Sequence, residues 1–118
     1  MAKAKLFIAN AFSLNMLGAL PPEGLTLTAR PLSLEEARSL LQGGFISAVG
    51  HESTAKVITT LTGVEVPPNR VAITLSPGDR VVVFQLGIRL QEGQILSEEE
   101  VFALYNEGKA SFALVEVL

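Results

Sequence analysis

The sequence contains no cysteine and no tryptophan, and histidine and aspartate occur only once each, as His51 and Asp79. Without cysteine there is no disulfide framework and nothing that indicates secretion, so we expect a cytoplasmic protein. Thiolate ligands are absent and imidazole and aspartate ligands are nearly so, which disfavours both zinc and hard-cation sites. We therefore expect neither a metal nor any other cofactor.

Long apolar runs and basic clusters are also missing. No run approaches the about 20 apolar residues that cross a bilayer, so we expect no membrane partner. Nine basic residues stand against twelve acidic ones, for a net charge of −3. A protein that binds duplex nucleic acid without sequence preference needs a basic surface. Duplex nucleic acid is therefore not an expected partner.

The chain is nevertheless rich in apolar residues. Hydrophobic residues make up 48% of its 118 positions, and the mean hydropathy is +0.41. We expect one domain spanning residues 1–118. A small domain with this much apolar surface often covers part of it in a subunit interface, so we expect a homodimer.

Strand and helix patterns alternate along the chain. Two capping boxes, Ser33 with Glu36 and Ser97 with Glu100, predict helix starts. A further helix is expected from the residues after His51 to about Thr62. Strands are predicted at residues 4–9, 25–30, 45–49, 71–75, 80–90 and 111–118. The expected fold is α/β (α+β): one domain with a mixed β-sheet flanked by helices.

Residues 71–75 and 80–90 flank the turn sequence SPGD and predict a β-hairpin. The even-numbered residues 82–90 should face the core. On the other face the hairpin register would set Arg70 opposite Gln85, with Arg89 beyond Gly87. A glycine within a strand often marks the close approach of a ligand or another backbone. Two arginines near such a gap suit phosphate oxygens.

His51 lies where the predicted strand 45–49 gives way to a helix. The amides that open a helix bind anions readily, and histidine exchanges a proton near neutral pH. His51 taken alone could equally be a polar loop residue. Likewise, Arg89 could simply pair with Glu92 on a solvated face. Asn10, Ser13 and Asn15 could be turn formers that bond their own backbone.

Several blocks of the sequence together resemble the viral anti-CRISPR ring nucleases, a family with viral and cellular members. These blocks occur in the same order over nearly the whole chain. They are NAFSLNML from residue 10, ISAVGHESTA from 46, NRVA from 69, FQLxxRLxEG from 84, LYxEGK from 104 and EVL at the end.

The resemblance implies a homodimer that holds cyclic tetra-adenylate, the second messenger of type III CRISPR systems, at its two-fold interface. It implies metal-independent cleavage to linear di-adenylates with 2′,3′-cyclic phosphate ends. This reaction would antagonise or switch off type III CRISPR signalling, in the host cytoplasm for a viral protein. His51 matches the family's general acid and Glu92 its supporting carboxylate. Arg89 matches the arginine that reaches the scissile phosphate from the partner subunit.

The remaining matches are ligand-positioning groups, namely Arg70, Asn10, Ser13, Asn15 and Gln85. The main alternative is a dimer that sequesters a cyclic nucleotide without cleaving it. A viral transcription regulator or structural protein is a further alternative, which the acidic composition disfavours.

Overall fold

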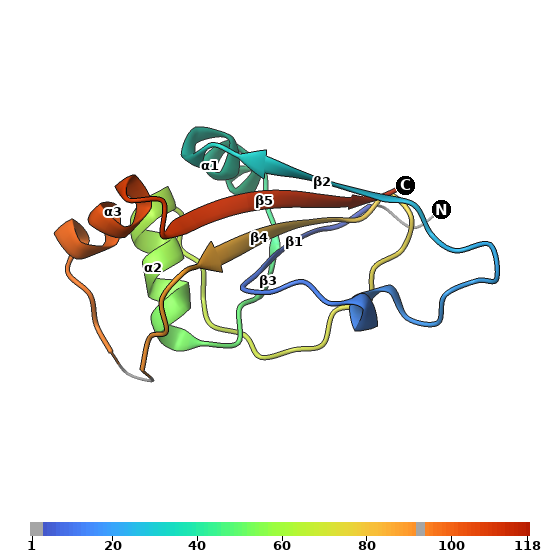
Figure 1. Ribbon diagram of the computed structural model, residues 1–118, viewed down its shortest axis with the longest axis horizontal. Helices are drawn as coiled ribbons and strands as arrows, with labels where there is room; N and C mark the ends of the chain where they lie inside the picture. The colour runs from blue at the N-terminus through green and yellow to red at the C-terminus, as the bar shows by residue number, and fades with distance from the viewer. Residues whose placement is uncertain (1–3, 92–93) are drawn as a thin grey trace.

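A twisted mixed β-sheet forms the centre of the molecule (Figure 1). The computed structural model describes residues 4–91 and 94–118. In this part of the chain, five strands and three α-helices are accompanied by one short 3₁₀ helix, η1. The strands are β1 (Leu6–Ala9), β2 (Leu27–Leu32), β3 (Ile46–Ala48), β4 (Arg80–Leu86) and β5 (Ala110–Val117). The helices are η1 (Leu14–Leu17), α1 (Leu34–Gln42), α2 (Glu52–Thr62) and α3 (Glu98–Asn106). The predicted fold class, an α+β domain with a mixed sheet, is confirmed.

The strand order is β2-β5-β4-β1-β3. β1 pairs in parallel with β3 on one side and with β4 on the other, whereas β5 runs antiparallel to β4 and to β2. The carboxyl ends of β1, β3 and β4 therefore meet at one edge of the sheet. The chain leaves this edge through Asn10, through Gly50 and His51, and through residues 87–91.

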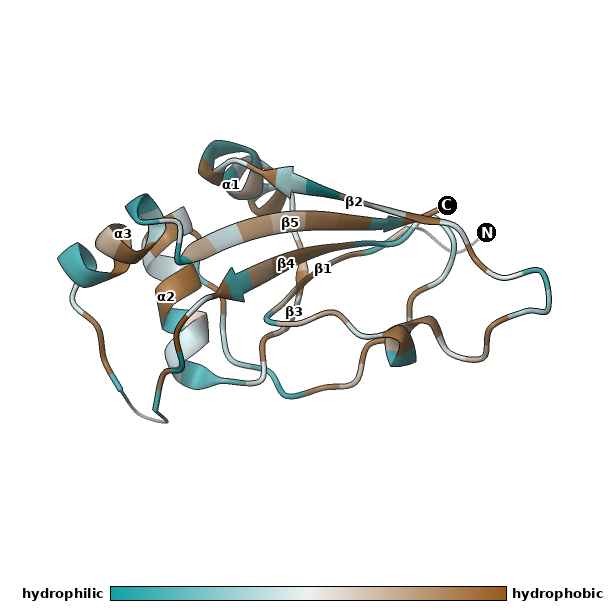
Figure 2. Cartoon of the chain, in the orientation of Figure 1, coloured by the Kyte–Doolittle hydropathy of each residue, from teal (hydrophilic) through white to brown (hydrophobic). Residues whose placement is uncertain are grey.

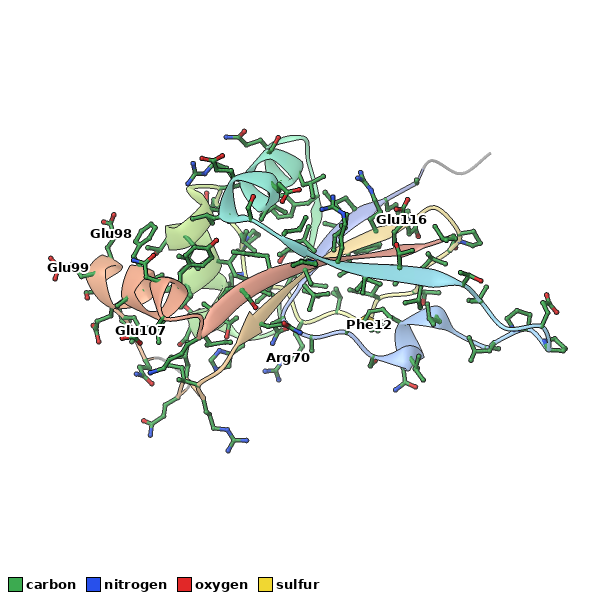
Figure 3. All side chains as sticks on the ribbon, turned by 45° about the horizontal axis from the view of Figure 1, so that its top comes forward. Phe12, Arg70, Glu98, Glu99, Glu107 and Glu116 are labelled. Atoms are coloured by element: carbon green, nitrogen blue, oxygen red, sulfur yellow. The ribbon has the colours of Figure 1, made fainter. Side chains whose placement is uncertain are left out.

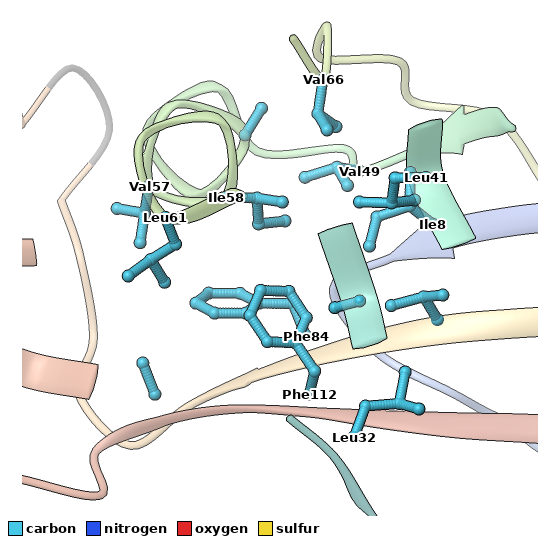
Figure 4. Close-up of a cluster of buried hydrophobic side chains, with 14 of the residues drawn as sticks. Ile8, Leu32, Leu41, Val49, Val57, Ile58, Leu61, Val66, Phe84 and Phe112 are labelled. Atoms are coloured by element: carbon cyan, nitrogen blue, oxygen red, sulfur yellow. The ribbon is translucent and has the colours of Figure 1, made fainter. Parts of the chain in front are cut away.

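One face of the sheet carries the main hydrophobic core, which α1, α2 and α3 cover (Figure 4). Phe84 of β4 and Phe112 of β5 are paired residues, and their rings lie 5.1 Å apart between centroids. Ile58 and Leu61 of α2 are fully buried in the same cluster. Burying an aliphatic or aromatic side chain of this size contributes about 1.5–3 kcal/mol to folding.

The opposite face is covered by irregular chain. Val81 and Val83 of β4 are buried there beside Ile73 and Leu75, with Leu17 of η1 in the same cluster. Because both faces of β4 are covered, this strand is hydrophobic along most of its length (Figure 2).

The predicted hairpin is wrong. Residues 71–75 are not a strand, because β1 and β5 occupy both edges of β4. They cross the sheet face instead, and the N–H of Leu75 donates to the carbonyl of Met16 at 2.7 Å. β4 ends at Leu86, so the predicted strand to residue 90 is too long, and Ile88 is 38% exposed rather than in the core.

The predicted SPGD turn does form, and Asp79 holds it together. The carboxylate of this buried residue accepts the N–H groups of Lys5 and Ser76, both at 2.9 Å. The N–H of Val117 donates to the Asp79 carbonyl at 3.1 Å, and the N–H of Gly78 donates to the Val117 carbonyl at 2.8 Å. The start of β1 and the end of β5 are thus tied to one turn, at the sheet edge opposite Asn10 and His51.

Both predicted capping boxes are confirmed. The Ser33 hydroxyl accepts the N–H of Glu36, whose carboxylate accepts the N–H of Ser33, and Ser97 and Glu100 repeat this exchange at α3. Gly63 ends α2 in the left-handed conformation, with φ of 70°. None of the helices described here has the length and apolar character needed to cross a membrane.

Candidate functional site

A hollow of about 310 Å³ opens at the sheet edge where β1, β3 and β4 end. Asn10 follows β1, His51 follows β3, and Arg89 follows β4, and all three line the hollow. The rest of its wall is Thr54 together with the apolar residues Phe84, Leu86, Ile88 and Leu90. Ligands of α/β sheets commonly bind at the carboxyl ends of parallel strands. The topology therefore joins three predicted site residues that are far apart in sequence.

His51 is the N-cap residue of α2. Its backbone is extended, with φ of −123° and ψ of 118°, and its side chain turns back onto the first turn of the helix. Nδ1 of the imidazole accepts the N–H of Thr54 at 3.2 Å and lies 3.0 Å from the Thr54 hydroxyl. The expected position of His51 at the opening of a helix is confirmed. The arrangement leaves Nε2 as the ring nitrogen available to a ligand.

This cap differs from those of the other two α-helices described. α1 and α3 both begin with a serine and have a glutamate three residues later. α2 has His51 and Thr54 at the corresponding positions. Serine, threonine, aspartate and asparagine are the side chains preferred at an N-cap. Histidine is therefore an unusual choice for stability at this position, which favours a functional reason for it.

The segment after β4 is held at both ends. The N–H of Gly87 donates to the carbonyl of Lys109 at 2.6 Å, and a Cβ at this position would lie 3.3 Å from the same oxygen. At the other end, Leu90 is buried and the Ser53 hydroxyl donates to the Gln91 carbonyl at 3.4 Å. The close approach predicted at Gly87 is thus that of another backbone. Between these anchors, Arg89 is exposed.

Arg70 does not lie opposite Gln85, because the hairpin that would pair them is absent. Its guanidinium donates instead to the carbonyl of Gly50, from Nε at 3.3 Å and from an Nη at 3.1 Å (Figure 3). Asn69 fixes the same segment beside β3, because its side-chain amide donates to the Ser47 carbonyl at 2.7 Å. Arg70 is therefore placed next to His51, although it does not line the hollow.

The other predicted residues are more dispersed. Gln85 is exposed on β4, and its side-chain oxygen accepts from the Ser111 hydroxyl at 3.4 Å. Ser13 is the N-cap of η1 but makes no side-chain cap, and Asn15 lies within η1. Neither lines the hollow. Glu92 lies outside the described residues, so its predicted role stays a prediction.

Two residues near His51 were not assigned a role from the sequence. Thr54 contacts the imidazole, and Ser53 holds Gln91. The signal for Thr54 was its spacing: a side chain three residues after an N-cap is the one that meets the cap.

Among the residues that the structure describes, no carboxylate lines the hollow. The acidic residues Glu98, Glu99 and Glu107 belong to the end of the molecule formed by α3 (Figure 3). Within residues 4–91 and 94–118, no group of three or more histidine, cysteine, aspartate or glutamate side chains could hold a metal ion. Asn10, His51 and Arg89 instead suit an anionic, hydrogen-bonding ligand.

Comparison with known proteins gives a consistent picture. The chain is 41% identical over 96 residues to "Uncharacterized protein 26" of Sulfolobus islandicus filamentous virus. This match covers 80% of this chain and 79% of the viral protein. The chain is 40% identical over 68 residues to "Uncharacterized protein ORF117" of Acidianus two-tailed virus, over 55% of this chain and 58% of that one. Both relatives are viral proteins.

A solved structure has the same fold. B116 of Sulfolobus turreted icosahedral virus superposes with a TM-score of 0.83 at 36% identity, over 96% of this chain and 99% of that chain. Residues 6–107, which contain the whole hollow, match the family described as STIV B116-like. The chain belongs to the STIV B116-like family.

Proposed function

We propose that this protein is a metal-independent ring nuclease that cleaves cyclic tetra-adenylate. The observation that carries the proposal is the hollow at the carboxyl edge of the sheet. Asn10, His51 and Arg89 come from three of the sequence blocks that resemble ring nucleases, and they line it together. If the resemblance in sequence had no functional meaning, there would be no reason for these three residues to line the same cavity.

The proposed reaction needs only a proton donor and a phosphate-stabilising group from the protein. A ribose 2′-hydroxyl of the ligand attacks the adjacent phosphorus, and the bond to the 5′-oxygen breaks. The 2′-oxygen gives up its proton to water, and His51 supplies a proton to the departing 5′-oxygen. Arg89 stabilises the negative charge that builds on the phosphate. Two such cuts convert the ring into two di-adenylates with 2′,3′-cyclic phosphate ends.

The nucleophile belongs to the substrate, so alignment is the main task of the protein. The amides at the start of α2 and the guanidinium of Arg70 beside Gly50 favour a phosphate in this region. Glu92 is proposed to support His51 in its protonated form.

We further propose that the working form is a homodimer. A four-fold cyclic ligand contains a two-fold axis, so two identical subunits can hold it symmetrically. Exposed apolar side chains are available for an interface: Leu14 of η1 is 66% exposed, and Val71, on the irregular segment 71–75, is 49% exposed.

The test is to incubate the purified protein with cyclic oligoadenylates of several ring sizes in excess EDTA and to resolve the products. We expect linear di-adenylates with cyclic phosphate ends, formed at the same rate with and without EDTA. A strict requirement for an added divalent ion would overturn the mechanism. Tight binding without any product would favour a sequestering protein instead.

A further inference from the structure

We propose that Thr54 is the positioning residue of His51, and that it makes Nε2 the ring nitrogen that gives its proton to the leaving oxygen. The role in proton transfer rests on the function proposed above. The contact itself does not, because two polar atoms of Thr54 meet one nitrogen of His51: the amide nitrogen at 3.2 Å and the hydroxyl oxygen at 3.0 Å.

These two atoms serve different protonation states of the ring. In the neutral imidazole, Nδ1 accepts the N–H of Thr54, so the single ring proton lies on Nε2. In the imidazolium, Nδ1 carries a proton and can no longer accept from that N–H. The Thr54 hydroxyl, a donor or an acceptor as needed, can then accept from Nδ1. When Nε2 gives its proton to the leaving oxygen, the proton on Nδ1 stays and is still accepted by the Thr54 hydroxyl; proton exchange with water then restores the form with its proton on Nε2. The ring therefore keeps a partner at Nδ1 throughout.

The fold favours the contact between the Thr54 hydroxyl and the imidazole of His51. Thr54 is only 7% exposed, so water does not compete freely for its hydroxyl. A threonine in a helix can also direct its hydroxyl to the carbonyl three or four residues earlier, as Thr59 does toward Ala55 at 2.9 Å. Thr54 lies in the first turn, where its hydroxyl meets the imidazole instead. Both Nδ1 contacts thus leave Nε2 for the ligand.

The charged groups described around this turn have their own partners or positions, apart from Thr54. Glu52 pairs with Lys56 on α2 at 3.6 Å, Arg70 donates to the Gly50 carbonyl, and Arg89 lines the hollow from the segment after β4. None of them is bonded to Thr54. Because Thr54 also lines the hollow, the measurement made without ligand is the one that reports the effect of its hydroxyl on His51 alone.

The sequence makes the first test unambiguous, because His51 is the only histidine. Nitrogen-15 labelling of histidine gives one pair of ring signals. In the wild-type protein at alkaline pH, we expect the ring proton on Nε2 and an unprotonated, hydrogen-bonded Nδ1. A neutral ring with its proton on Nδ1 would overturn the proposal. This test needs no ligand.

The second test compares Thr54→Val with Thr54→Ser. Valine keeps the shape and the backbone N–H but removes the hydroxyl, whereas serine keeps both contacts. At mildly acidic pH, a smaller fraction of His51 rings should carry both protons in the valine variant than in the serine variant. With cyclic tetra-adenylate, we expect kcat to fall about tenfold in the valine variant, the value of one hydrogen bond to a charged group, with KM nearly unchanged.

Serine should stay close to wild type in both measurements. Equal behaviour of the two variants in ring protonation and in kcat would contradict a role for the hydroxyl. If the wild-type protein does not cleave cyclic tetra-adenylate at all, the proposed function fails, while the ring-nitrogen signals still decide whether Thr54 positions His51.

Discussion

At the scale of single residues, His51 and Asp79 show two different uses of a rare side chain. Asp79 is buried, and both of its carboxylate oxygens accept backbone N–H groups. His51 is partly exposed, and within residues 4–91 and 94–118 only its Nδ1 makes a hydrogen bond. The aspartate is therefore structural, whereas the histidine is the residue for which we propose a role in ligand chemistry.

Substitutions at His51 should separate stability from activity. Serine is a better N-cap than histidine and alanine is a poor one, so His51→Ser should be as stable as wild type or more so, and more stable than His51→Ala by about 1 kcal/mol. Both variants should cleave cyclic tetra-adenylate at least ~100-fold more slowly, because the proposed general acid is lost. Thermal unfolding and single-turnover assays measure the two effects.

Binding of cyclic tetra-adenylate by either His51 variant, followed by calorimetry, should change little, because the proposal assigns the phosphates mainly to arginines and backbone amides. Turnover near the wild-type rate in His51→Ser would show that His51 is not the acid.

Removal of the Asp79 carboxylate should destabilise the fold. Asp79→Ala leaves the N–H groups of Lys5 and Ser76 without their acceptor, and we expect a loss of about 2 kcal/mol in the free energy of unfolding. Asp79→Asn keeps one carbonyl oxygen and should lose less. Urea denaturation of the three proteins gives the comparison, and equal stability of all three would contradict the structural role.

At the scale of elements, the two capping boxes give α1 and α3 a dependence on pH. The hydrogen bond from the Ser33 backbone lowers the pKa of Glu36 below its ordinary value of 4.5, and the Ser97 backbone lowers the pKa of Glu100 in the same way. A carboxylate whose pKa is lower in the folded state stabilises the fold above its unfolded pKa. This contribution is lost as the pH falls through the lower, folded value.

The Glu36→Gln, Glu100→Gln double variant should therefore lose part of this acid sensitivity. Glutamine can replace glutamate in a capping box, so the helices should still form, but the two positions no longer titrate. Stability measured from neutral pH down through the carboxylate range should fall less steeply than in wild type. Parallel curves for both proteins would show that the caps do not contribute to the pH dependence.

The helices were predictable because their signals are local. Ser33 and Ser97 mark helix starts by chemistry within one turn, and the structure confirms both. The prediction of a strand at residues 71–75 was wrong for a different reason. Burial of Ile73 and Leu75 on one side produces the alternation of a strand, but the alternation does not say what lies beside the backbone. The edges of β4 were already taken by β1 and β5.

In the candidate site, too, features with a local sequence signal could be predicted and features that depend on strand pairing could not. The position of His51 could be read from the strand-to-helix junction, and the structure confirms it. The gathering of Asn10, His51 and Arg89 depends on the parallel order β3-β1-β4, which no local pattern encodes. The predicted register of Arg70 with Gln85 failed together with the hairpin on which it rested.

At the scale of the whole molecule, the proposed dimer can be tested by mixing variants. Arg89 is exposed, and no hydrogen bond or ion pair holds its guanidinium among residues 4–91 and 94–118. If it acts on a ligand held by the partner subunit, His51→Ala and Arg89→Ala homodimers are both inactive. A heterodimer of the two keeps one intact site, so activity should reappear, up to about half of the wild-type level per heterodimer.

Subunit exchange has to be verified by native mass spectrometry, and each variant mixed with itself is the control. No recovery after verified exchange would place His51 and Arg89 of the same chain in one site, around the hollow that they already share. A monomer at all concentrations would contradict the dimer itself.

The turn at Asp79 allows the order of the segments along the chain to be changed by circular permutation. Lys5 and Val117 are both hydrogen-bonded to this turn, so the two ends of the described chain lie side by side (Figure 1). A short glycine-serine linker could join them, and the exposed turn at residues 22–24 could be opened instead. In such a circular permutant, β1 would be the last strand to be synthesised and would still have to enter between β3 and β4. Because the joined ends lie at the edge opposite the hollow, the permutant should retain the geometry of the hollow while it folds along a different route.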